Sequence, residues 1–90
     1  MADEWRNLGP KSRQMLAAAG ITEWAQLEAL GAVAAWLRVK AVWPGASLNL
    51  LWALQGALCD LPWQQVAREQ RLSLLLALEQ EVQVQSQRGD

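Results

Sequence analysis

The residues best suited to chemistry in this chain form a short turn that is expected to open a helix. Gly9 and Pro10 are followed by Lys11, Ser12 and Arg13, which places two cations and a hydroxyl in the first turn of that helix. Proline suits the first helical position because its missing N–H would be unpaired there anyway, and Gly9 is expected to supply a backbone angle that a side chain would resist. The unpaired N–H groups of a helix start, together with its positive dipole end, favour an anion. The predicted phosphate or nucleic-acid contacts are Arg6, Gly9, Lys11, Ser12 and Arg13.

The same turn also has a purely structural interpretation, since a Leu-Gly-Pro turn can join two helices in a protein that binds nothing. The formal net charge of the chain is −1. Most proteins dedicated to duplex DNA carry a strong basic excess, because phosphate neutralisation dominates their affinity. Tight non-specific DNA binding is therefore not expected, and weak nucleic-acid binding remains an alternative.

Catalytic and metal chemistry find little material in the sequence. The chain has no histidine, so it cannot build a Ser-His or Cys-His couple or an imidazole metal site. It also has no Walker loop and no Gly-x-Gly-x-x-Gly motif. Cys59, the only cysteine, is interpreted as a small apolar filler beside the acidic Asp60. We expect no enzymatic activity, no cofactor, no metal and no small-molecule substrate.

Length and composition indicate the class of protein. Ninety residues make one domain, and a chain of this size buries only about two-thirds of its unfolded surface, so help from a partner or from self-association is expected. No apolar run reaches the roughly eighteen residues that span a bilayer. The acidic start, Met1 to Glu4, lacks the layout of a secretory signal. With a single cysteine, the expected location is the reducing cytoplasm, without membrane association.

The elements that must position the turn all read as helices. The predicted ranges are 10–19, 23–30, 32–43, 48–59 and 67–82. Gly20 is expected to end the first helix in the left-handed conformation with Ile21 folding back, Thr22 to cap the second, and Gly31 to break the chain before the third. The predicted fold is all-α, with about five short helices in one compact domain over residues 1–82, a helix-hairpin-helix-like N-terminal half, and a flexible tail at 83–90.

The helix at 48–59, capped by Ser47, is apolar nearly all round, which is typical of a central buried helix. Gly56 interrupts it at a cost of about 1 kcal/mol relative to alanine, and the expected reason is close approach of another backbone. In the last predicted helix, one stripe carries leucines followed by a glutamate, with two more leucines beside it. The stripe is Leu72, Leu75, Leu76 and Glu79, and its neighbours are Leu74 and Leu78.

The six tryptophans admit two interpretations. Exposed indoles beside cations can stack on single-stranded bases, and the candidates are Trp5 beside Arg6 and Trp36 near Arg38 and Lys40. Alternatively, they are core and interface filler in a chain that lacks Phe and Tyr. Their helical spacing favours the second interpretation.

Several segments occur in an order and spacing that resembles a known family. They are Asn7 to Ser12, Leu16 to Ile21, Leu30 to Val33, and Ser47 to Ala57. Together they resemble the C-terminal domain of the TfoX/Sxy family, the bacterial regulators of natural competence. The resemblance implies an all-helical domain with a helix-hairpin-helix-like start, and a link to transcription of competence genes with the cyclic-AMP receptor protein. The full-length regulators carry an N-terminal α/β domain before this one, so a stand-alone copy is expected here. Asn7 stands where DNA-binding helical hairpins usually have a first glycine.

Two functions follow from these observations. The favoured one is a non-enzymatic regulatory module, related to TfoX, that acts through protein–protein contacts. The apolar excess, the apolar central helix and the near-neutral charge suit packing against another protein or a second copy. The alternative is a weak nucleic-acid-binding domain that uses the turn before residue 10 to hold phosphate.

Overall fold

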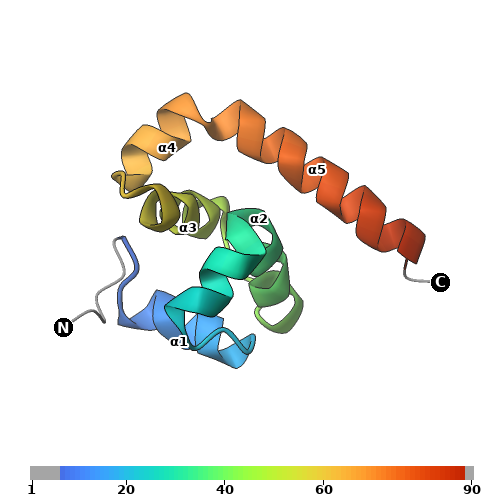
Figure 1. Cartoon of the computed structure of the whole chain (residues 1–90), viewed down its shortest axis with the longest axis horizontal. Helices are drawn as coiled ribbons and strands as arrows, with labels where there is room; N and C mark the ends of the chain where they lie inside the picture. Colours follow the sequence, from blue (N-terminus) through green and yellow to red (C-terminus); the bar gives the residue numbers. More distant parts are fainter. Residues whose placement is uncertain (1–6, 89–90) are drawn as a thin grey trace.

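Five helices surround one apolar core in the computed structural model, which describes residues 7–88 and the side chains of residues 7–84 (Figure 1). The helices are α1 (Pro10–Ala18), α2 (Trp24–Val42), α3 (Leu48–Cys59), α4 (Trp63–Glu69) and α5 (Arg71–Arg88). The described residues form no strand. The prediction of a single all-α domain is therefore confirmed.

Helix α3 lies at the centre of the fold. It begins and ends where the sequence predicted, and Leu51 and Leu54 are completely buried. Its neighbours are α4 on one side and α2 on the other. Ser47 precedes the first helical residue as predicted, but its side chain makes no capping hydrogen bond. The apolar character of α3 on all sides is thus explained by neighbours on several sides.

The turn between α1 and α2 has the predicted form. Gly20 is left-handed (φ 86°), and the N–H of Ile21 donates to the carbonyl of Leu16 at 2.9 Å while the N–H of Gly20 donates to Ala17 at 3.0 Å. This pair of bonds is a Schellman motif, which satisfies carbonyls that the end of α1 leaves open. Ile21 is buried against the core. The turn lets α1 pack on α2, as expected for the helix-hairpin-helix-like N-terminal half.

Helix α2 is bent at Gly31, where φ is 80° and ψ is 166°. The predicted interruption is therefore confirmed, although the two halves follow each other so closely that they form one bent helix. The expected cap, Thr22, is wrong by one residue, because Glu23 is the capping position. The Gln26 side chain reaches back, and its Oε1 accepts from the N–H groups of Thr22 and Glu23 at 2.8 and 3.0 Å.

The last third of the chain differs from the prediction. A separate helix, α4, begins directly after Pro62, and the backbone breaks at Gln70 before α5 starts. The predicted single helix over 67–82 is therefore wrong at its start. Helix α5 also continues to Arg88, whereas the flexibility expected for residues 83–90 stays a prediction. None of the helices within residues 7–88 combines the length and the apolarity that a bilayer crossing requires.

Two of the tryptophans belong to the core. Trp36 and Trp52 are buried, and the indole N–H of Trp36 donates to the carbonyl of Ser47 at 2.9 Å. The ammonium of Lys40 lies 5.7 Å from the centre of the Trp36 ring and donates to two carbonyls of the α2–α3 connection, Pro44 at 2.7 Å and Ala46 at 3.0 Å. Base stacking on Trp36 is therefore excluded, because ring and cation both hold this connection in place. Trp5, the other stacking candidate, lies outside the described residues.

Candidate functional site

The turn before α1 is built around Asn7 and not around Gly9. Asn7 is left-handed (φ 69°), whereas Gly9 has an extended backbone (φ −81°, ψ −176°) that any residue adopts. The expectation that Gly9 supplies the unusual angle is therefore wrong. Asparagine tolerates the left-handed region better than most residues because its short amide can bond locally. Asn7 thus takes the conformation that a glycine would take at this position.

The side chain of Asn7 bonds to a part of the chain more than fifty residues away. Its Nδ2 donates to the carbonyl of Leu61 at 2.7 Å, and its Oδ1 accepts from the N–H of Trp63 at 3.3 Å. We call these two bonds the Asn7 clamp. Because Trp63 is the first residue of α4, the clamp fixes the start of α4 against the segment that leads into α1.

Gly56 of α3 lies against the Asn7 clamp. A Cβ on Gly56 would come within 2.5 Å of Asn7 Nδ2 and within 2.6 Å of the Leu61 oxygen. Both distances are shorter than non-bonded contacts allow. The predicted close backbone approach at Gly56 is therefore confirmed, and the approaching groups are the carbonyl of Leu61 and the amide of Asn7.

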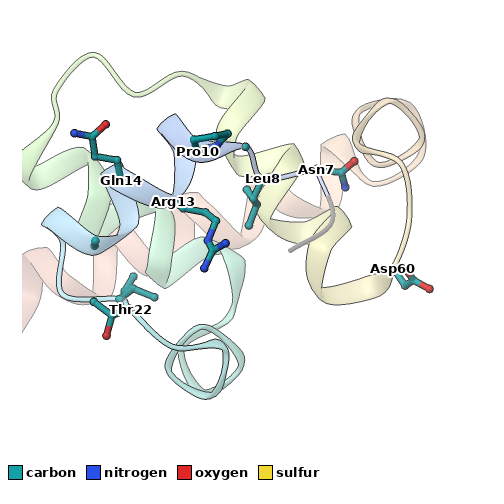
Figure 2. Close-up of a pocket in the computed structure, with 10 residues that line it drawn as sticks. Asn7, Leu8, Pro10, Arg13, Gln14, Thr22 and Asp60 are labelled. Atoms are coloured by element: carbon teal, nitrogen blue, oxygen red, sulfur yellow. The ribbon is translucent and has the colours of Figure 1, made fainter. Parts of the chain in front are cut away.

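The start of α1 has the geometry expected of an uncapped helix. The N–H of Arg13 donates to the carbonyl of Gly9 at 3.0 Å, and no side-chain capping bond is made at this end. Lys11 is exposed, whereas Ser12 and Arg13 are half-buried. Arg13 borders an open hollow of about 1010 Å³ together with Leu8 and Thr22 (Figure 2).

Lys11 and Ser12 line a different depression. This second groove, of about 360 Å³, also takes in Asn49 from α3 and Trp63 from α4. Residues two apart on a helix do not share a face, so Lys11 and Arg13 point to different sides of α1. The structure thus brings Lys11 and Ser12 together and places Gly9 and Arg13 beside the other hollow. Arg6 lies outside the described residues, and phosphate binding by this set stays a prediction.

A second candidate surface, which the sequence did not reveal, lies on α5. Leu72 is 71% exposed and Leu76 is 53% exposed, while Leu75 between them is half-buried. We call these three residues the leucine patch. Leu74 is the leucine that enters the core, with Leu78 packed against it from the same side. The stripe that the sequence singled out therefore faces outward, and the glutamate at position 79 within it was the available signal.

Comparison with protein families identifies the chain. The family model described as the TfoX C-terminal domain matches residues 3–78. Searches among curated proteins and among solved structures each gave no match. The matched range contains the Asn7 clamp, all of α1 to α4, and the part of α5 that carries the leucine patch. The chain belongs to the TfoX C-terminal domain family.

Proposed function

We propose that this TfoX-related domain is a non-enzymatic module that acts through protein–protein contacts, and that the leucine patch of α5 makes them. The observation that carries the proposal is the exposure of Leu72 and Leu76 on one face of a helix that packs on the core with its other face. Contiguous exposed apolar surface marks interaction sites in soluble domains.

Clustering distinguishes the leucine patch from other exposed apolar residues. Single exposed apolar side chains are normal and need no partner. Leu72 and Leu76 are one helical turn apart, and Leu75 widens the same surface. Burying a leucine side chain is worth about 1.5–3 kcal/mol. A partner that covers all three therefore gains enough free energy to form a specific contact.

Family membership supplies the proposed setting of this contact. The TfoX/Sxy regulators are linked to transcription of competence genes, so we infer a cytoplasmic partner that belongs to this regulation. The neutral balance of charge suits such a role, because a module that packs on proteins needs no basic excess.

One observation favours the second candidate, weak binding of single-stranded nucleic acid. In the groove beside α1, Lys11 and Ser12 lie with Trp63, whose side chain is 36% exposed. A cation beside an accessible indole can hold a phosphate and stack a base. With one or two cationic contacts, the affinity should fall with a log–log salt slope of only about −1 to −2.

Site-specific photo-crosslinking in the native host separates these candidates. A photoreactive residue at position 76 should give adducts with protein, and the same residue at exposed position 42 of α2 should not. Adducts at position 76 equal to those at position 42 would contradict the proposal. A protein-free result at position 76, together with DNA adducts from position 11, would replace it with the nucleic-acid function.

A further inference from the structure

We infer that the partner on the leucine patch is a second copy of this chain, whose α5 lies antiparallel to the first. This inference rests on the proposed function and names the occupant of its surface. The observation behind it is that the surface around Leu75 is complementary to itself when it is rotated by a two-fold axis.

The outer side of α5 has room for such a partner. Helix α5 packs against α2 and α4, and in Figure 1 it runs along one edge of the molecule, away from α1 and α3. Its eighteen residues make a rod about 27 Å long. Leu74 and Leu78 face the core, so a second helix on the outer side would meet Leu72, Leu75 and Leu76 without displacing any core residue.

Charge order determines the direction of the pair. Arg71 and Glu79 lie four residues before and four residues after Leu75, and they form one row with it because residues four apart share a helix face. Both side chains are exposed, and within the described chain no ion pair holds either of them. A two-fold axis at Leu75 places Arg71 of each copy against Glu79 of the other. A parallel pair would instead place like charges together.

The same axis brings apolar residues together. Leu75 meets Leu75 of the second copy, and Leu72 meets Leu78, since these lie three residues to either side of the axis. Two-fold contacts of this kind close on themselves and give a dimer, not a filament. A partner of other sequence would need to reproduce the order of one cation, three leucines and one anion. A second copy supplies this order without further assumption.

A contact made by one helix from each copy is smaller than the roughly 1,000 Å² of a stable interface. The dimer is therefore expected to dissociate on dilution, with a dissociation constant in the micromolar range. Sedimentation equilibrium of the full chain, over a concentration series that reaches about 100 µM, measures this directly. A single species of monomer mass over the whole series would overturn the inference.

Reversal of charge tests the pairing itself. Arg71→Glu and Glu79→Arg should each weaken the dimer about tenfold, because each places two pairs of like charges at the contact. The double variant Arg71→Glu/Glu79→Arg should restore the original affinity, since both pairs are then reversed. Arg38→Glu is the matched control, because Arg38 is an exposed arginine on α2. A double variant no better than the single ones would overturn the antiparallel arrangement.

Disulfide trapping separates this inference from the proposed function. With Cys59→Ser, the variant Leu75→Cys should oxidise to a covalent dimer in the purified full chain, and Val42→Cys should not. If the chain is monomeric and position 76 crosslinks to a different protein, the second copy is excluded while the proposed function stands. If position 76 crosslinks to no protein at all, both fail.

Discussion

Replacement of Gly56 by alanine should destabilise the fold, although alanine is the better helix former. The new Cβ would lie 2.5 Å from Asn7 Nδ2 and 2.6 Å from the Leu61 oxygen. The Asn7 amide can rotate away if both bonds of the Asn7 clamp break. The Leu61 carbonyl cannot, because it is backbone and because the Leu61 N–H donates to Gly56 itself at 2.8 Å. The loop between α3 and α4 must therefore move.

The magnitude follows from three opposing contributions. Alanine gains about 1 kcal/mol over glycine inside a helix. Overpacking of a close contact costs about 1–3 kcal/mol, and loss of the two clamp bonds costs roughly 1 kcal/mol for each bond. Gly56→Ala should therefore lower the free energy of unfolding by about 1–4 kcal/mol.

Urea unfolding followed by tryptophan fluorescence, at fixed protein concentration, measures this change. Arg38→Ala compared with Arg38→Gly gives the intrinsic alanine–glycine difference at an exposed position of α2. The penalty of Gly56→Ala should shrink by about 1 kcal/mol in an Asn7→Gly background, which keeps the left-handed backbone and removes the amide. A Gly56→Ala protein as stable as the parent would refute the reasoning, because helix preference would then act without opposition.

Three further predictions concern backbone and charge. Gly31→Ala should lower stability by about 1–3 kcal/mol, because φ 80° with ψ 166° is a region almost restricted to glycine; a thermal midpoint equal to that of the parent would show that the bend in α2 is absent. Gly20→Val should cost more than about 1 kcal/mol because Gly20 is left-handed, whereas Gly9→Val should cost less than about 1 kcal/mol; urea midpoints in the reverse order would restore Gly9 as the strained position. Lys11→Ala should leave stability within about 0.5 kcal/mol and remove any binding of single-stranded DNA at low salt, and unchanged binding would exclude Lys11 from the site.

The helix ends that depend on a special backbone were predictable from the sequence. Gly20 and Gly31 each adopt the positive φ that a stop or a bend needs, and few residues other than glycine do so without strain. The extent of α3 followed from Ser47 at one end and from the connector after Cys59 at the other. Its burial followed from an apolar surface on every side.

Features that depend on distant contacts were not predictable. The division of α4 from α5 at Gln70 has no glycine or proline to mark it, and it depends on how α4 packs against α3. The left-handed backbone of Asn7 is stabilised by partners at Leu61 and Trp63, which no local pattern connects to it.

The candidate surface on α5 shows the same limit. Helix α5 carries leucines on both faces, so periodicity alone does not tell which face is inside. Only the neighbouring helices decide that Leu74 is buried and that Leu72 is exposed. At the start of α1, the sequence identified the cations but not the sides of the helix to which Lys11 and Arg13 point.

The most direct test of the central claim is whether the leucine patch is covered in the cell. Hydroxyl-radical footprinting compares the oxidation of leucine side chains in living cells with that in dilute purified protein. We predict that Leu72 and Leu76 are protected in the cell while exposed Val42 is oxidised equally in both samples. Equal oxidation of Leu72 and Leu76 in the two samples would contradict a protein contact on this face of α5.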